Sequence, residues 1–171
     1  MDKIINNPDY SRAKSIHEFT VRNLKGELIK LESYKGFICV IVNITTNSQL
    51  TKQNYKHFND LMEQHGDKLR ILAFPCYQFG DQPLSEEEIA KHAEENDVKF
   101  DIFARIEVNG EGANALWKYL KHAHPIGTNK QVNVIKSNFT KYIVNKLGIP
   151  VERHGPEVDP LKFDQLVISY F

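Results

Sequence analysis

Two apolar, β-branched runs separated by one amphipathic segment constrain the fold of this chain more than any other feature. The runs cover residues 37–43 and 69–75, and each has the continuous apolar character of a strand buried on both faces. From residue 50 to residue 64, apolar side chains recur close to the ~3.6-residue period of a helix. Strands joined through a helix pair in parallel, because the helix returns the chain to its starting edge. The sequence therefore predicts an α/β protein with a buried parallel pair at its centre.

The segments on either side of this unit add further strands and helices. Two short alternating stretches joined by a polar turn, at residues 19–31, predict an N-terminal hairpin. Ser85 and Glu88 form a capping-box pattern at the start of a helix that extends to about residue 96. The remaining expected elements are an extended segment at 100–108, a helix at 113–122, an antiparallel strand pair at 139–145 and 151–153, and a closing helix at 160–169 with Leu161, Leu166 and Val167 as its apolar positions.

Length and charge suit one globular domain and exclude several classes of protein. The chain has 171 residues, and its 22 basic and 22 acidic residues give a formal net charge of zero. We therefore expect no nucleic-acid partner. The longest apolar stretches have about seven residues, whereas a membrane span needs ~20, so we expect no transmembrane segment. Residues 1–14 are polar and lack the apolar part of a signal peptide, which predicts a polar extension at 1–14 before a folded domain at 15–171.

The cysteines and histidines argue against a metal site. Cys39 and Cys76 are the two cysteines, and each lies inside an apolar run, as a small core side chain does. This spacing excludes a disulfide scaffold and a cysteine-based zinc site. The seven histidines are scattered, and we interpret them as solvated surface residues. We predict no metal and no bound cofactor, and the two unpaired cysteines favour a cytoplasmic location.

The segment Phe74–Gly80 reads Phe-Pro-Cys-Tyr-Gln-Phe-Gly and resembles the Phe-Pro-Cys-Asn-Gln-Phe-Gly signature of the glutathione peroxidase family. Further short segments resemble that family in the same order, at residues 15–20, 35–36, 42–43, 50–55, 70–75, 108–110 and 138–141. The chain is most similar to the compact phospholipid-hydroperoxide type, which lacks the loop that tetrameric members use for assembly. The resemblance implies a thioredoxin-like fold, with a central mixed sheet, flanking helices and an N-terminal hairpin, in a monomer.

The resemblance also implies a site for hydroperoxide reduction, with glutathione or thioredoxin as the reductant. In the family, a selenocysteine or cysteine at the start of the first long helix acts with a Gln, a Trp and an Asn. By alignment of these motifs, Ser48 occupies the nucleophile position, whereas Gln78 and Asn138 match the family's Gln and Asn. Ser137 stands at the position of the family's Trp. The chain also departs from the family at Gln49, which replaces a Gly, and at Tyr77, which replaces the signature Asn.

These departures predict that the chain as written lacks peroxidase activity. A serine hydroxyl forms no accessible anion near neutral pH and cannot pass through an oxidised sulfur or selenium state. Ser137 removes an indole N–H donor and an apolar wall from the site. The region 85–100 holds no second cysteine, with Ala93 about where the thiol-recycling variants carry one, so a disulfide relay is excluded.

Two explanations for the serine remain open. In one, the site has diverged naturally, and the protein is a binding or regulatory module for glutathione, a hydroperoxide or a protein ligand. In the other, Ser48 replaces a selenocysteine or cysteine of an active peroxidase. The second explanation accounts for position 48 alone and leaves Gln49, Tyr77 and Ser137 unexplained. We therefore favour natural divergence.

Each candidate residue also has a purely structural alternative. Ser48 would serve as the N-cap of the helix that follows it. Gln78 would bridge backbone groups within its loop. Cys76 would be either a substitute thiol or an inert buried residue, and burial favours the second. Tyr77, together with Phe79, would line a small apolar pocket or a partner surface in place of the peroxide cleft.

Overall fold

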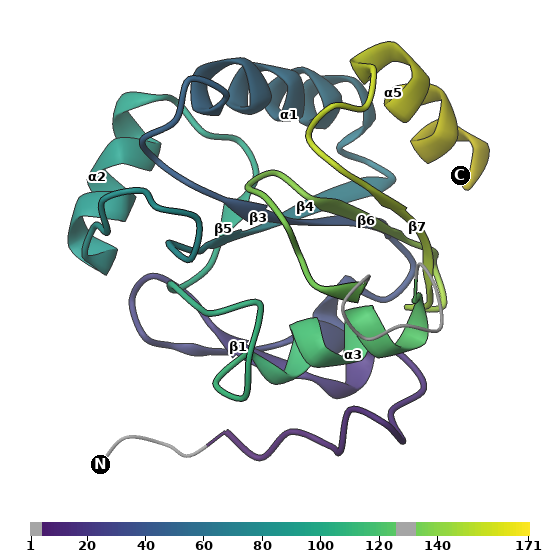
Figure 1. The fold of residues 1–171 in the computed structure, drawn as a ribbon. Helices are drawn as coiled ribbons and strands as arrows, with labels where there is room; N and C mark the ends of the chain where they lie inside the picture. Colours follow the sequence, from purple (N-terminus) through teal and green to yellow (C-terminus); the bar gives the residue numbers. More distant parts are fainter. Residues whose placement is uncertain (1–4, 126–132) are drawn as a thin grey trace.

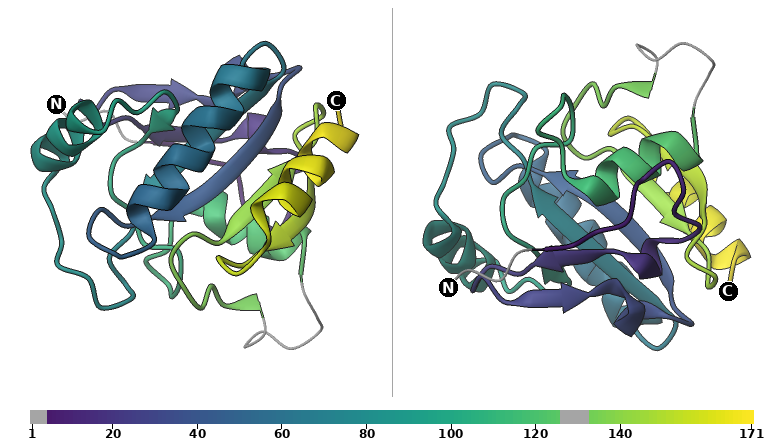
Figure 2. Two further views of the ribbon diagram at one scale, coloured as in Figure 1. Left: turned by 90° about the horizontal axis from the view of Figure 1, so that it is seen from above. Right: turned by 90° about the horizontal axis from the view of Figure 1, so that it is seen from below.

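The computed structural model describes residues 5–125 and 133–171 and has three layers (Figure 1). The middle layer is a five-stranded sheet with the strand order β5 (Asp101–Ile102), β4 (Leu69–Pro75), β3 (Ile38–Ile44), β6 (Lys141–Val144) and β7 (Pro150–His154). The helices α1 (Thr51–His65) and α5 (Pro160–Ser169) cover one face (Figure 2). The other face carries α3 (Ala115–Ala123) and the separate hairpin of β1 (Thr20–Arg22) and β2 (Leu28–Lys30). The helix α2 (Glu86–Glu95) lies at the β5 side of the sheet, and two short 3-10 helices, η1 (Ile16–Glu18) and η2 (Leu31–Tyr34), adjoin the hairpin.

The predicted β-α-β unit at the centre of the chain is confirmed. β3 and β4 pair in parallel over seven residue pairs, from Ile38 with Leu69 to Ile44 with Pro75. All residues of β3 are buried, as expected for a strand that is covered on both faces. The helix between them packs Phe58 and Leu61 onto the sheet. Hydrophobic burial on both faces therefore fixes this unit as the centre of the domain.

The late antiparallel strand pair is confirmed as well. β6 pairs antiparallel with β3 on one side and with β7 on the other, which makes the sheet mixed. The turn between β6 and β7 is held by Asn145, whose side-chain oxygen accepts the N–H groups of Leu147 and Ile149. Gly148 in this turn has φ +81°, and an added Cβ would lie 2.8 Å from the ring of His17. Only glycine therefore combines this backbone conformation with this close approach.

The sheet separates two apolar cores, and alternation along each strand decides which core a side chain enters. Cys39 and Ile41 of β3 face α3 and the hairpin, whereas Val40 and Val42 face α1 and α5. In β6, Tyr142 and Val144 belong to the α3 side, and Ile143 belongs to the α1 and α5 side. The core on the α3 and hairpin side contains Leu116, Trp117 and Leu120 of α3, which are buried as the helical pattern predicted.

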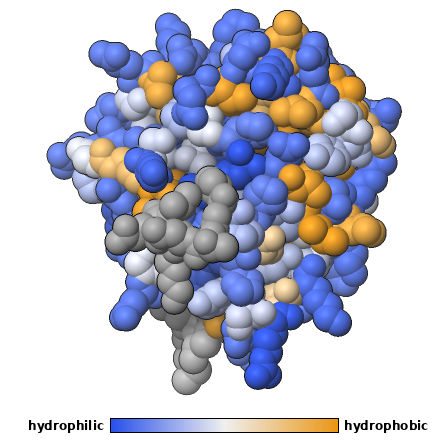
Figure 3. Space-filling model, turned by 45° about the vertical axis from the view of Figure 1, so that its right-hand side comes forward, coloured by the Kyte–Doolittle hydropathy of each residue, from blue (hydrophilic) through white to orange (hydrophobic). Residues whose placement is uncertain are grey.

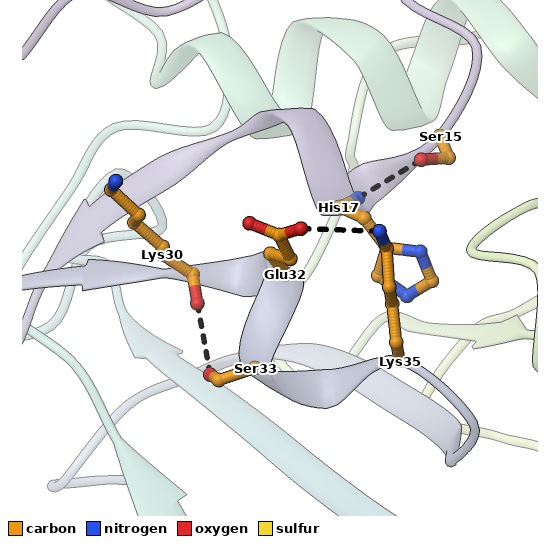
Figure 4. A network of polar contacts seen from close by, with 6 residues as sticks. All are labelled: Ser15, His17, Lys30, Glu32, Ser33 and Lys35. Atoms are coloured by element: carbon orange, nitrogen blue, oxygen red, sulfur yellow. Dashed lines mark hydrogen bonds and ion pairs between the residues drawn. The ribbon is translucent and has the colours of Figure 1, made fainter.

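The N-terminal segment lies against the domain in the part that the structure describes. The Asn7 side chain bonds both backbone groups of Thr20, accepting its N–H at 2.8 Å and donating to its carbonyl at 3.1 Å. Farther along, η1 is closed by a capping box between Ser15 and Glu18. Figure 4 shows the backbone N–H of His17 donating to the Ser15 hydroxyl, and the ion pair of Lys35 with Glu32 beside it. Residues 1–4 of the predicted extension lie outside the described residues.

Two predicted elements differ from the structure. The expected extended segment at 100–108 forms a strand only at Asp101–Ile102, because its later backbone groups are shared between different partners. Phe103 bridges to Asn23, and the Ile106 N–H donates to the Pro75 carbonyl, so no continuous ladder forms. In α5, Leu161 is 65% exposed in the first turn, whereas Phe163, which the sequence pattern missed, is fully buried.

The interpretation of the histidines as solvated surface residues is wrong for several of them. The His57 side chain is only 15% exposed, and its Nε2 lies 2.6 Å from Asp164 Oδ1, which joins α1 to α5. His154 lies 3.0 Å from Glu152 of the same strand, and its ring packs edge-on against Phe163 of α5. Burial lowers the pKa of His17, whose Nε2 atom is buried and has no hydrogen-bond partner among the described residues. These rings therefore belong to the packing between elements.

The surface and the cysteines agree with a folded, well-covered domain. Cys39 and Cys76 are both buried and free, as the apolar runs predicted. Figure 3 shows apolar side chains in separate groups among hydrophilic ones on the face that it presents. Across residues 5–125 and 133–171, no helix has both the length and the apolarity to cross a membrane, and no group of three His, Cys, Asp or Glu side chains is arranged to hold a metal ion.

Candidate active site

Three loops that carry the predicted site residues meet at one edge of the sheet. The loop after β3 holds Ser48, and the loop after the parallel strand β4 holds Gln78. The segment before β6 holds Ser137 and Asn138, and it reaches the same edge because β6 runs antiparallel to β3. The backbone N–H of Cys76 donates to the Ile44 carbonyl at 2.9 Å, which keeps the first two loops adjacent. Sheet topology alone therefore gathers residues that are about 90 positions apart in the sequence.

Ser48 lies in a short, strongly hydrogen-bonded turn before α1. Its hydroxyl accepts the N–H of Leu50 at 3.0 Å, and its own N–H donates to the Thr51 hydroxyl at 3.2 Å. The Thr51 hydroxyl in turn donates to the Thr45 carbonyl at 2.9 Å. The formal N-cap of α1 is Leu50, so Ser48 stabilises the turn that leads into the helix and is not the N-cap that we predicted.

The half-buried Ser48 hydroxyl has none of the partners that activate a nucleophilic serine. Within the described residues, its hydrogen bond is with a backbone N–H, and no histidine, lysine or carboxylate contacts it. An activated serine requires an adjacent general base. The start of the 15-residue helix α1 would favour an anion at this point, but a hydroxyl does not provide one near neutral pH. The geometry is therefore that of a turn-stabilising serine.

Gln78 is held by the backbone of a neighbouring loop. Its side-chain oxygen accepts the N–H groups of Val108 at 2.8 Å and Asn109 at 3.1 Å. Its side-chain nitrogen donates to the Asn109 carbonyl at 3.1 Å, and the Cys76 thiol lies 3.5 Å from the oxygen. Both ends of the amide are thus used for structure. The bridging role that we considered as an alternative describes this residue, although the loop that it bridges lies about 30 residues farther along.

Asn138 is also directed to a structural partner. Its side-chain nitrogen donates to Asp81 Oδ2 at 2.7 Å, which ties the segment before β6 to the loop after β4. Its side-chain oxygen is buried and has no hydrogen-bond partner among the described residues. Ser137, at the position of the family's Trp, is half-buried, and its carbonyl accepts the Thr140 hydroxyl at 3.0 Å. No hydrogen bond joins Ser48, Gln78 and Asn138 to one another within the described part of the chain.

Asn43 is the residue that organises the third loop, and sequence reasoning assigned it no role. It is fully buried at the end of β3. Its side-chain oxygen accepts the Thr140 N–H at 3.0 Å, and its side-chain nitrogen donates to the Ser137 carbonyl at 3.1 Å. The sequence did offer one signal, a single amide near the end of an otherwise apolar strand. Because a buried polar group needs hydrogen-bond partners, such a residue indicates a contact with a neighbouring segment.

Tyr77 closes the gap between the first two loops. Its hydroxyl lies 2.8 Å from the Thr46 hydroxyl, and burial raises the pKa of the phenol. Tyr77 and Gln78 line a cavity of about 500 Å³ together with Arg105, Ile106 and Glu107. The predicted pocket beside Tyr77 therefore exists, but it contains charged side chains and is not apolar. Phe79 packs against the core on the α3 side and does not line it.

Cys76 does not supply a substitute nucleophile in this arrangement. The residue is fully buried at the end of β4, and burial raises the pKa of its thiol. Burial likewise raises the pKa of Cys39 to about 12. A reactive cysteine requires an accessible thiolate. Both thiols are therefore core side chains.

Comparison with known structures identifies the class of fold. The chain superposes on a crystal structure of T. cruzi GPX1 with a TM-score of 0.72 and 29% identity, covering 92% of this chain and 96% of that one. The crystal structure of Trgpx in apo form gives a TM-score of 0.74 at 25% identity, covering 92% and 95%. A thioredoxin-family thiol:disulfide interchange protein from Chlorobium tepidum shares the fold at 9% identity, with a TM-score of 0.66 and 93% and 97% coverage. The predicted thioredoxin-like fold is confirmed.

Sequence comparison identifies the family within that class. The family model described as Glutathione peroxidase matches residues 16–121. The phospholipid hydroperoxide glutathione peroxidase of Pongo pygmaeus is 42% identical over 165 residues, which cover 95% of this chain and 83% of that protein. The phospholipid hydroperoxide glutathione peroxidase GPX4 of Mus musculus is 42% identical over 154 residues, or 89% and 78% of the two chains. The chain belongs to the glutathione peroxidase family.

Proposed function

We propose that this chain is a glutathione peroxidase family member that binds a ligand without reducing hydroperoxides. The observation that carries the proposal is the state of Ser48, whose hydroxyl accepts a backbone N–H and contacts no general base among the described residues. Peroxide reduction requires a soft, easily ionised atom that can be oxidised and then regenerated by a thiol. A hydroxyl satisfies neither requirement.

The neighbouring residues support the same conclusion. The amides of Gln78 and Asn138 donate to Asn109 and Asp81, and among the described residues neither amide hydrogen-bonds to the Ser48 hydroxyl. The position of the family's Trp holds Ser137, which brings no indole N–H. In an active site these donors would stabilise the departing oxygen. Four departures at one edge of the sheet are better explained by natural divergence than by replacement of one residue.

Family membership and the cavity beside Tyr77 support a proposal for the ligand of this protein. We propose glutathione, a hydroperoxide or a protein as the bound molecule, in a monomeric cytoplasmic protein. The cavity offers both charges, with Arg105 for a carboxylate and Glu107 for an ammonium group. A zwitterionic peptide such as glutathione carries both groups. Calorimetric titration with reduced glutathione should give heat, and Arg105→Ala should weaken binding more than Arg12→Ala, an exposed arginine outside the cavity.

A peroxide assay tests the loss of turnover. With glutathione as reductant and hydrogen peroxide or a phospholipid hydroperoxide as substrate, we expect the protein to consume peroxide at the rate of the buffer. Ser48→Cys should become oxidised by peroxide, because the start of α1 lowers the pKa of a thiol placed there. Ser48→Ala serves as the matched control and should behave like the unmodified chain. Consumption by the unmodified chain well above the buffer rate contradicts the proposal.

The alternative, an active peroxidase with selenocysteine or cysteine at position 48, makes a separate prediction. In that case the gene carries a selenocysteine or cysteine codon at position 48, and the restored protein turns over many equivalents of peroxide. A serine codon excludes it. The codon therefore distinguishes the two explanations without any assay of the protein.

A further inference from the structure

A lysine lies in the apolar core between the sheet and its two covering helices. Lys141 is the first residue of β6, between Phe139 and Ile143, which both face α1 and α5. Lys141 is only 2% exposed. Its ammonium nitrogen lies 6.0 Å from the ring centre of Phe58 and 5.9 Å from that of Phe163. Lysine is almost never buried in this way without a paired charge. The side chain therefore needs an explanation beyond packing.

Among the described residues, the hydrogen bonding of this lysine uses only part of its donor capacity. Its Nζ donates to the Phe139 carbonyl at 3.0 Å, whereas an ammonium group has three donors. Burial lowers the pKa of Lys141 to about 8, and the charge of Glu157 acts in the opposite direction. About one quarter of the amine is then neutral at pH 7.5, compared with about one part in a thousand for an exposed lysine. The neutral amine is a nucleophile.

Lys141 also lines a cavity, which gives this amine a space in which to react. The cavity has a volume of about 370 Å³ and is bounded by Gln53, Asn54 and His57 of α1, by Lys141, and by the segment 156–160 before α5. It is formed by residues other than those of the Tyr77 cavity, and it contains neither Ser48 nor Gln78. We call it the Lys141 pocket.

The charges around the Lys141 pocket restrict what can bind there. Glu157 and Asp159 line it from the segment before α5 and disfavour an anion. His57 lines it from α1, with its Nε2 bonded to Asp164 Oδ1 of α5. A cation would meet the protonated fraction of Lys141 itself. An uncharged ligand therefore fits these charges best.

We propose that Lys141 is the amine of a covalent binding site for small, uncharged aldehydes. The lone pair of neutral Nζ adds to the carbonyl carbon, and a C–N bond forms as the carbonyl π electrons move to oxygen. The nitrogen then loses a proton and the oxygen gains one, which gives a neutral carbinolamine. Loss of water from the resulting carbinolamine gives an imine. The step needs no oxidant or reductant, and water reverses it. This modification is independent of the peroxide site, so its test does not depend on the proposed function.

Trapping the imine in the unmodified protein tests the proposal. The protein is treated with propionaldehyde and cyanoborohydride at pH 7.5, and hydride converts each imine into a stable secondary amine that peptide mass spectrometry counts at every lysine. We expect Lys141 to react at least tenfold faster than Lys91, whose side chain is 78% exposed on α2. The rate at Lys141 should level off above about pH 8, whereas the rate at Lys91 should still rise. Reaction at Lys141 no faster than at Lys91 at pH 7.5 overturns the proposal.

A variant at the mouth of the pocket shows whether the aldehyde enters through it. Gln53 is exposed on α1 and lines the pocket, so Gln53→Trp should slow reaction at Lys141 at least fivefold and leave Lys91 unchanged. An unchanged rate at Lys141 would mean that the aldehyde reaches the amine by opening of the fold, and it would refute the pocket as a binding site.

Discussion

Replacing Lys141 by methionine measures how strongly the buried ammonium opposes folding. The pKa of Lys141 is lowered from 10.5 to about 8 because burial penalises its charged form. The unfolded chain therefore holds this proton more tightly than the folded protein does. Protonation destabilises the fold fully below about pH 8, and the destabilisation is relieved as the pH rises toward 10.5.

The expected magnitude follows from this difference. At ~1.4 kcal/mol per pH unit, a fall from 10.5 to about 8 corresponds to about 3 kcal/mol at pH 7. Methionine has a similar length and no charge, and it suits an apolar site. It loses the hydrogen bond to the Phe139 carbonyl, which costs about 1 kcal/mol. We therefore expect Lys141→Met to raise the free energy of unfolding by about 2 kcal/mol at pH 7. This advantage should vanish before pH 10.5, and at pH 10.5 the variant should be slightly less stable than the unmodified chain, because only the lost hydrogen bond then remains.

Urea denaturation of both proteins between pH 7 and pH 10.5 checks this prediction. The difference between the two proteins cancels the other titrating groups, because they are common to both. Lys91→Met, a change at an exposed position, is the matched control and should alter the free energy of unfolding by less than about 0.5 kcal/mol at every pH. Stability curves for Lys141→Met and the unmodified chain that run parallel across this range would refute the reasoning.

Two further substitutions test contacts that hold the site and the β6–β7 turn at the opposite end of the sheet. Asn43→Ala leaves the buried Thr140 N–H without its acceptor and should lower the free energy of unfolding by about 2 kcal/mol, whereas the same change at exposed Asn96 should cost less than about 1 kcal/mol in urea denaturation. Equal losses would contradict the role of Asn43. Gly148→Ala should lower the thermal midpoint by about 5 °C, because a Cβ meets the His17 ring and the backbone has φ +81°. Adding His17→Ala should recover part of the loss, and no recovery would show that the ring contact is unimportant.

The fold could be predicted where local pattern and tertiary burial agree. The run at 37–43 is apolar at every position up to Asn43, and its pairing with 69–75 follows from the helix between them. The segment 100–108 looked equally extended, but its hydrogen-bond partners lie in β1, β4 and the adjoining turns. Because these hydrogen-bond partners are far from residues 100–108 in the sequence, no local pattern in this segment indicates them. The exposure of Leu161 has the same cause, since the orientation of α5 decides which of its apolar residues face the sheet.

The candidate site could be predicted at the level of residue positions and not of contacts. Motif order was enough to select Ser48, Gln78, Ser137 and Asn138, and the topology brings their loops to one edge. The sequence could not reveal that Asn109 engages the amide of Gln78, because this partner lies 31 residues away. Lys141 was missed for a different reason. A lysine in a strand usually indicates a position that faces solvent. Here the packing of α1 and α5 against the sheet buries that position, and the sequence does not show this packing.

The shortness of β5 bears on how this protein behaves at high concentration. The regular strand pairing of β5 ends at Ile102, and the Ala104 N–H donates to the Arg22 carbonyl instead of pointing outward. A foreign strand approaching this side of the sheet would find few unpaired backbone groups to pair with. Self-assembly by strand addition is thereby blocked at one end of the sheet through geometry, with no need for repelling charges.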